Sequence, residues 1–169
     1  QKLITDGRGQ VVALMDAHQE TAKSLQAEFC PDAQLAASLP ELLQIEAIDA
    51  AIICTPTAEH YRQSVACLDR GWHLLCEKPL ASTRDEILEL IQRAEQARSK
   101  GQVFSLGYQR RHTSLYRTLR REIQLGRWGA VRAIVSHNVE NWQQTIGGTW
   151  RDDPKQNPGG FLTDAGRHK

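Results

Sequence analysis

The stretch Leu74-Leu75-Cys76-Glu77-Lys78-Pro79-Leu80 decides the fold of this chain. Trp72 to Cys76 is a short apolar run, which is typical of a buried strand. Pro79 cannot donate a sheet hydrogen bond and favours an extended backbone at Lys78, so the strand ends with Lys78 at its carboxyl tip. Ligands bind beyond the carboxyl ends of strands in an open α/β sheet, which makes Lys78 a candidate for chemistry. The alternative, in which Glu77 and Lys78 simply end the strand in solvent, fits this stretch equally well.

Other short runs predict further strands of the same kind. Val11 to Met15, Ala50 to Cys54 and Val103 to Gly107 are mostly apolar and have the length of buried strands. Apolar residues recur between them at helical spacing, and Thr83 with Glu86 forms a capping box at the start of one expected helix. The expected helices lie near residues 19–29, 39–43, 58–68 and 83–100. Strands that alternate with helices predict the α/β class, with a Rossmann-type, doubly wound parallel sheet.

The pattern changes after the last of these strands. Leu115 to Ile123 has the spacing of a helix, and Val131 to Val139 alternates apolar and polar residues, as a half-buried antiparallel strand does. Trp142 to Lys169 is polar and rich in Gly and Pro, which predicts a long loop of a length that is often functional. We therefore expect the doubly wound domain to occupy residues 1–108 and residues 109–169 to begin a second α/β domain.

Composition limits the class of protein. Lys and Arg number 21 against 20 Asp and Glu, so no strong field attracts nucleic acid or an anionic membrane surface. No apolar run is long enough for a transmembrane helix, and no signal-peptide pattern is present. The cysteines have no CxxC spacing, which favours reduced thiols of a cytoplasmic protein over a metal site or disulfides. They are Cys30, Cys54, Cys67 and Cys76.

The two ends of the sequence suggest a fragment. Gly7-Arg8-Gly9 precedes a strand, whereas the glycine-rich loop of a dinucleotide fold follows one, so we interpret these residues as a turn. The chain opens at Gln1 without a methionine and stops at Arg167-His168-Lys169 without a closing element. We expect that the first strand, its glycine-rich loop and most of the second domain are missing.

Asp16 is a candidate cofactor ligand. An acid at the tip of the second strand of a dinucleotide fold accepts hydrogen bonds from the adenosine ribose and repels a 2′-phosphate. Its neighbour Ala17 offers no positive charge, so NAD is favoured over NADP. The alternative, in which Asp16 is the N-cap of the helix that starts near Gln19, fits the spacing equally well.

Thr55-Pro56-Thr57-Ala58-Glu59-His60 follows a strand tip and opens a helix. Backbone N–H groups at such a place can face the phosphate or ribose of a cofactor. The spacing alone favours an ordinary capped turn instead.

Asp164 and His168 stand four residues apart, a spacing that places both on one face if the segment is helical. Such a pair suits proton transfer, because imidazole titrates near neutral pH and a carboxylate can orient it. Metal binding is a rival interpretation, but only two ligands are offered and the other histidines show no matching spacing. A surface histidine without a role is the third.

Three further groups are weak signals. Trp150-Arg151 and Pro158-Gly159-Gly160 suggest that backbone approaches a ligand with an arginine nearby. Gln109-Arg110-Arg111-His112 is a small basic cluster that a solvated face explains as well.

Taken together, these residues resemble the Gfo/Idh/MocA family of sugar and cyclitol oxidoreductases. The Glu-Lys-Pro signature is fairly specific, and the resemblance extends from about Val11 to His168. The matching motifs are Ile53-Cys54-Thr55-Pro56 with His60, Gly71, Cys76-Glu77-Lys78-Pro79-Leu80-Ala81, Gly107-Tyr108-Gln109-Arg110-Arg111, Gly126 to Val131, Trp150-Arg151, and Gly159-Gly160 through Asp164-Ala165-Gly166-Arg167-His168.

The resemblance implies an NAD(P)-binding Rossmann domain followed by an α/β domain whose open sheet forms homo-oligomers, dimers or tetramers. It implies that Lys78, Asp164 and His168 are catalytic, with His168 as the base, Lys78 stabilising the oxyanion, and Asp164 orienting the pair and holding a neighbouring substrate hydroxyl. It implies no metal. The positions that it places at the cofactor are Asp16, Thr55, Pro56, His60, Glu77, Lys78 and Arg151.

The implied activity is hydride transfer between NAD, or less favourably NADP, and a secondary alcohol of a small sugar, polyol or cyclitol. The missing glycine-rich loop and second sheet leave the activity of this fragment open. Two alternatives remain: a nucleotide-binding sensor or regulatory protein of the same fold, and an inactive truncated remnant. Absorbance of NADH with a panel of polyols separates a sensor from an enzyme.

Overall fold

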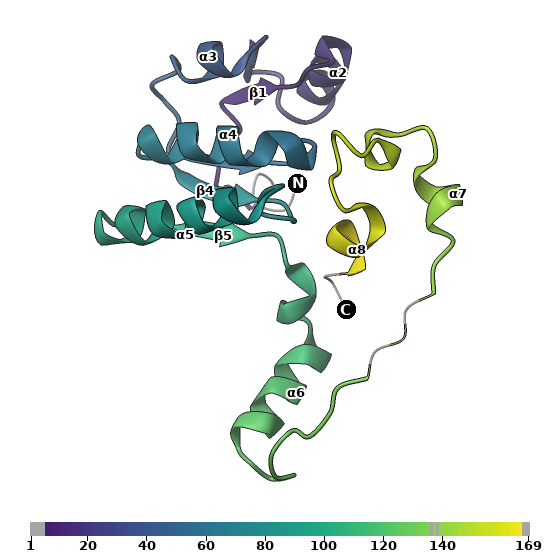
Figure 1. Cartoon of the computed structure of the whole chain (residues 1–169). Coiled ribbons are helices and arrows are strands. Elements are labelled where there is room, and N and C mark those ends of the chain that lie inside the picture. The colour runs from purple at the N-terminus through teal and green to yellow at the C-terminus, as the bar shows by residue number, and fades with distance from the viewer. Residues whose placement is uncertain (1–5, 136, 138, 167–169) are drawn as a thin grey trace.

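Strands and helices alternate along the first part of the chain, as the sequence predicts (Figure 1). The structure is a computed structural model that describes residues 6–135, 137 and 139–166. β1 (Ala13–Met15) and β2 (Gln34–Ala36) pair in parallel and form a two-stranded sheet. The prediction of β1 is confirmed, whereas β2 is an addition to the predicted strands.

The second sheet contains the strand that precedes Lys78. β4 (His73–Cys76) lies between β3 (Ala50–Ile53) and β5 (Phe104–Leu106), and both pairings are parallel. Ile53 is level with Cys76, and Cys76 is level with Leu106. The carboxyl ends of all three strands therefore meet at one edge, the place where ligands bind in open α/β sheets.

Helices connect the strands at the predicted places. α2 (Gln19–Phe29) joins β1 to β2, and α3 (Leu39–Leu42) lies between β2 and β3. α4 (Thr57–Asp69) joins β3 to β4, and α5 (Arg84–Ser99) joins β4 to β5. The predicted capping box at Thr83 is confirmed. Parallel strands with helical crossovers are the architecture expected of a Rossmann-type fold.

The core lies between the second sheet and the pair α4 and α5, which pack against each other. Leu74 and Cys76 of β4 belong to it, together with Leu90, which is fully buried. Ile52 and Leu75 are 64% and 39% exposed, because alternate side chains of a strand point to opposite faces and the described helices cover only one. The predicted strands are therefore buried on one face and partly exposed on the other within the described residues.

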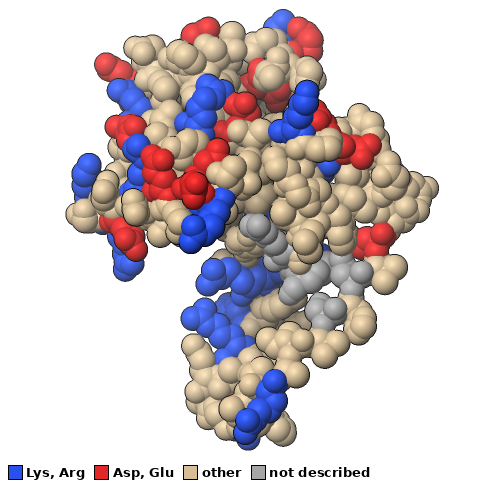
Figure 2. Space-filling view, in the orientation of Figure 1, with Lys and Arg blue, Asp and Glu red and all other residues tan. Residues whose placement is uncertain are grey.

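The chain then leaves the sheets through the 3-10 turn η1 (Gln109–His112) and α6 (Ser114–Gln124), as Figure 1 shows. Figure 2 shows blue Lys and Arg side chains gathered on this lower part, whereas both charges mix over the sheets and their helices. The predicted helix is confirmed, and the cluster at Arg110 is exposed.

The half-buried strand expected at Val131–Val139 is wrong for the described residues of that range, which form no strand. Ile134 and Val139 are 87% and 96% exposed. A strand takes its backbone hydrogen bonds from a neighbour, and none of the described strands lies beside this segment. Alternation alone therefore does not produce one.

The expectation of a long loop from Trp142 onward is also wrong. This segment contains α7 (Trp142–Ile146), the 3-10 turn η2 (Trp150–Asp152) and α8 (Gly160–Asp164). Figure 1 shows α8, in yellow, returning beside the end of the sheet. The backbone N–H of Ala58 donates to the carbonyl of Gln156 over 3.2 Å, so the returning segment touches the start of α4.

None of the helices in the described ranges is both long and apolar enough to cross a bilayer.

Candidate active site

Three hydrogen bonds fix the backbone at the carboxyl ends of β3, β4 and β5. The N–H of Glu77 donates to the carbonyl of Ile53 over 2.9 Å, and the N–H of Gly107 donates to the carbonyl of Cys76 over 2.9 Å. The carboxylate of Glu77 accepts the N–H of Lys78 over 3.2 Å. Glu77 and Lys78 are thus fixed at the centre of the edge by the strands on either side.

Lys78 reaches across to Asp164, 86 residues further along the chain. Its ammonium group donates to the backbone carbonyl of Asp164 over 2.9 Å and also pairs with the carboxylate Oδ1. The side chains are 14% and 3% exposed. The interpretation that Lys78 merely ends the strand in solvent is therefore wrong.

A second cation faces the same carboxylate. Nε of Arg151 lies 3.4 Å from Oδ2 of Asp164, and the guanidinium stacks 4.3 Å from the ring centroid of Trp150. Oδ2 makes no hydrogen bond among the described residues and is buried. Asp164 thus joins Lys78, which follows β4, to Arg151 of η2, and the two cations compensate the charge of a buried carboxylate.

Asn157 is a site residue that sequence reasoning missed. It is 1% exposed, and its Nδ2 donates to the backbone carbonyl of Arg151 over 2.9 Å. Its Oδ1 is buried without a hydrogen bond in the described part of the chain. Because Gln156 next to it accepts the N–H of Ala58, Asn157 fixes η2 where the returning segment meets α4. A lone Asn before Pro158 gives no sequence signal for this role.

His60 lies inside the fold and is 1% exposed. Its Nδ1 is 2.6 Å from the carbonyl of Pro79, and its Nε2 is 2.8 Å from the carbonyl of Thr55. The ring therefore ties the end of β3 to the loop that carries Lys78.

The turn before α4 is not an ordinary capped turn, so that interpretation is wrong. Pro56 is the N-cap and has no side-chain hydrogen bond to the helix. The hydroxyl of Thr55 donates to Oε1 of Gln63 over 2.8 Å instead. One N–H of the first turn, that of Ala58, has the carbonyl of Gln156 as its partner.

Asp16 stands at the end of β1, in the other sheet. Its Oδ1 accepts the N–H of His18 over 2.8 Å, and His18 is the N-cap of α2. The interpretation of Asp16 as the N-cap is therefore wrong, because it lies two residues ahead. Its Oδ2 makes no hydrogen bond within the described residues, and the side chain is half-buried.

His168 lies outside the described residues. Asp164 is the last residue of α8, and the expected placement of Asp164 and His168 on one helix face therefore stays a prediction. Gly159 begins α8 with a φ of +85°, and a Cβ there would lie 2.3 Å from Cγ2 of Thr163. The fold of α8 therefore explains this glycine without a ligand.

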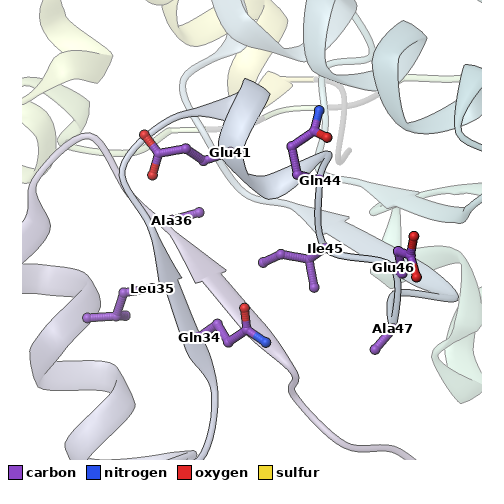
Figure 3. A pocket seen from close by; sticks show the side chains of 8 residues that line it. All are labelled: Gln34, Leu35, Ala36, Glu41, Gln44, Ile45, Glu46 and Ala47. Atoms are coloured by element: carbon purple, nitrogen blue, oxygen red, sulfur yellow. The ribbon is translucent and has the colours of Figure 1, made fainter.

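Within the described ranges, neither a metal site nor the hollow shown in Figure 3 lies at the site residues named above. No three His, Cys, Asp or Glu side chains there come together as a metal site. A hollow of about 570 Å³ opens between β2 and the segment after α3, and none of the predicted site residues lines it (Figure 3). Its lining is Gln34, Leu35, Ala36, Glu41, Gln44, Ile45, Glu46 and Ala47.

The family described as an oxidoreductase family with an NAD-binding Rossmann fold, GFO_IDH_MocA, matches residues 2–108. The chain is 30% identical over 160 residues to the scyllo-inositol 2-dehydrogenase (NADP(+)) IolW of Bacillus subtilis, and the match covers 94% of this chain and 42% of that protein. The chain thus spans less than half the length of this relative.

Solved structures of oxidoreductases have a fold similar to that of this chain. An oxidoreductase domain protein from Kribbella flavida superposes with a TM-score of 0.84 at 25% identity, over 94% of this chain and 43% of that one. The WlbA dehydrogenase from Chromobacterium violaceum, solved in complex with NADH and UDP-GlcNAcA, gives a TM-score of 0.67 at 26% identity, over 75% of this chain and 36% of that one.

Proposed function

This chain belongs to the Gfo/Idh/MocA oxidoreductase family with its NAD-binding Rossmann fold, and on that premise we propose that it carries the reaction centre of a dehydrogenase. The complete protein transfers a hydride between a nicotinamide cofactor and a secondary alcohol of a sugar, polyol or cyclitol. The observation that supports this most is the buried pair of Lys78 and Asp164 at the carboxyl ends of the parallel strands.

The residues present fit a dinucleotide. Oδ2 of Asp16 has no hydrogen bond within the described residues and can accept one from a ribose hydroxyl, and the charge of Asp16 disfavours a 2′-phosphate. Thr55 and Pro56 open α4 without a side-chain cap, which suits an approach of ribose or phosphate. We therefore propose NAD over NADP, although IolW is named for NADP(+).

Bound NAD supplies the hydride acceptor, and the chain supplies the groups around the alcohol. Lys78 donates a hydrogen bond to the reacting oxygen and stabilises its developing negative charge. Asp164 orients Lys78 and holds a neighbouring hydroxyl, and His168 takes the hydroxyl proton. Glu77 and Arg151 face the cofactor, and His60 holds Thr55 and Pro79 in place beside it.

The two parts of the chain have different proposed roles. We propose that residues 1–108 bind the nucleotide and that residues 109–169 begin the domain that binds substrate and forms homo-oligomers. A cytoplasmic location is part of the same proposal.

The test uses the complete protein that contains this chain, incubated with NAD and a panel of sugars, polyols and cyclitols. We expect NADH absorbance to appear with at least one substrate. Lys78→Ala should lower turnover roughly 10²- to 10⁴-fold while NADH binding persists. Lys100→Ala, at the exposed end of α5, is the matched control and should leave turnover unchanged.

Two results would contradict the proposal. Turnover that survives Lys78→Ala removes the role given to that residue. NADH binding without turnover of any substrate in the panel supports the cofactor-bound sensor instead.

A further inference from the structure

Gly107, directly after β5, has no assigned role in the reaction. A Cβ at this position would lie 2.8 Å from Cδ and Oε2 of Glu77 and 2.9 Å from its Oε1. Carbon atoms of real side chains do not approach so closely. The φ of Gly107 is not among the positive values of this chain, so space and not backbone conformation requires the glycine here.

The carboxylate of Glu77 is held from two directions. Oε2 accepts the backbone N–H of Lys78, and the carboxylate occupies the space that a Cβ at position 107 would need. Because the N–H of Gly107 is itself bonded to Cys76, the backbone under the carboxylate cannot move away without breaking the strand pairing. The absence of a side chain at Gly107 thus determines where the carboxylate of Glu77 lies next to Lys78.

We propose that Gly107 is a positioning residue for cofactor binding, a role that rests on the proposed function. By lacking a side chain, it lets Glu77 lie back against β5 and leave the edge open for the nicotinamide end of the cofactor. An ionised carboxylate only accepts hydrogen bonds, so the cofactor group that Glu77 receives is an N–H or O–H donor, such as the carboxamide.

The same geometry predicts that a methyl group at this place disturbs the site more than the fold. The atoms it meets are the far end of a flexible side chain, which can rotate outward without a change in the core. This rotation of the Glu77 side chain would move its carboxylate into the space of the cofactor and away from the cofactor N–H or O–H group that it accepts. Binding of NADH should therefore weaken while the melting temperature stays nearly constant.

The experiment compares Gly107→Ala with Gly9→Ala in the complete protein. Gly9 also lacks a positive φ, and a Cβ there meets nothing within 4 Å, so it is a matched control. Fluorescence titration with NADH should show about tenfold weaker binding for Gly107→Ala, the loss of roughly one hydrogen bond to a charged group. Gly9→Ala should bind NADH like the wild type.

A double variant separates this role from a structural one. If the conflict is with the carboxylate, Glu77→Ala removes it, so the Glu77→Ala, Gly107→Ala protein should bind NADH as Glu77→Ala does. An equal loss in both backgrounds, or wild-type affinity of Gly107→Ala, would overturn the inference. A wild-type protein that binds no NADH would overturn the proposed function itself, which is a different result.

Discussion

The two parts of the chain are built differently. Residues 6–108 contain nearly all of the buried apolar side chains, gathered between the second sheet and the helices α4 and α5. Residues 109–135 contain no buried side chain, and Leu115 and Leu119 of α6 are 73% and 53% exposed. Burial resumes only in the returning segment. Its buried members are Ile146, Asn157, Asp164 and Ala165.

This difference teaches how the site is assembled. The first part holds Lys78 by strand pairing and core packing, whereas the returning segment is attached through polar contacts at the site itself. Among its described residues, the buried polar ones are Asp164 and Asn157. Substitutions in the first part should therefore change global stability, and substitutions in the returning segment should change local order and chemistry.

The largest effect should come from the core. Leu90→Ala removes a fully buried side chain under the sheet and should lower the free energy of unfolding by about 2 to 5 kcal/mol. Leu119→Ala, its matched control on α6, should change it by less than about 0.5 kcal/mol. Urea unfolding of the 169-residue chain measures both. Equal losses would remove the distinction between the two parts.

A smaller and more local effect is expected at Asn157. Asn157→Ala removes the hydrogen bond to the carbonyl of Arg151, so the returning segment should open more easily, by about 1 to 2 kcal/mol. Amide hydrogen exchange should rise across residues 150–165 and stay unchanged in β3, β4 and β5. Asn141→Ala, an exposed cap of α7, is the control for the loss of an asparagine. Faster exchange in the strands would show that the segment stabilises the whole fold.

The smallest effect concerns the alkylation of the cysteine thiols, which distinguishes cysteines in the core from the one at the exposed edge. Burial raises the pKa of Cys67 to about 11 and that of Cys76 to about 12. Because only the thiolate reacts, both should resist alkylation at pH 8 and react only as the pH rises toward those values or the chain unfolds. Reaction of Cys67 at pH 8 in the native state would show that the core opens.

Cys54 lies at the edge and is exposed as a residue, although its thiol is partly buried. This partial burial is the larger cause that raises the pKa of the Cys54 thiol, and the negative charge of Glu77 is the second. Glu77→Gln removes the second cause, so the pKa of Cys54 should fall and its alkylation at pH 8 should accelerate. Cys30, beyond α2, is the internal reference.

Apolar runs in the sequence predicted most of the strands in residues 6–108. Apolar runs identified β1, β3, β4 and β5, because burial of a strand requires them. β2 was missed, since Gln34-Leu35-Ala36 is not part of a longer apolar run and only its pairing with β1 defines it as a strand. The strand expected at Val131–Val139 failed for the converse reason: its pattern fits, but no described strand pairs with it.

The site was predictable in its residue types but not in its contacts. The position of Lys78 follows from the end of a strand, which is a local property. The contact of Lys78 with Asp164 depends on a chain reversal through α7, η2 and α8, each of at most five residues and too short for periodicity to reveal. Asn157 and Gly107 gain their roles only from that packing, or from the neighbouring strand.

The central claim is that Lys78 and Asp164 act as one unit across the two parts, and a double-mutant cycle tests it most directly. The complete protein is compared with Lys78→Ala, Asp164→Ala and the double variant by kcat/KM for the best substrate. Each single substitution should lower kcat/KM roughly 10²- to 10⁴-fold. The double variant should have a kcat/KM no lower than that of the more impaired single variant. Losses that multiply in the double variant would contradict the account.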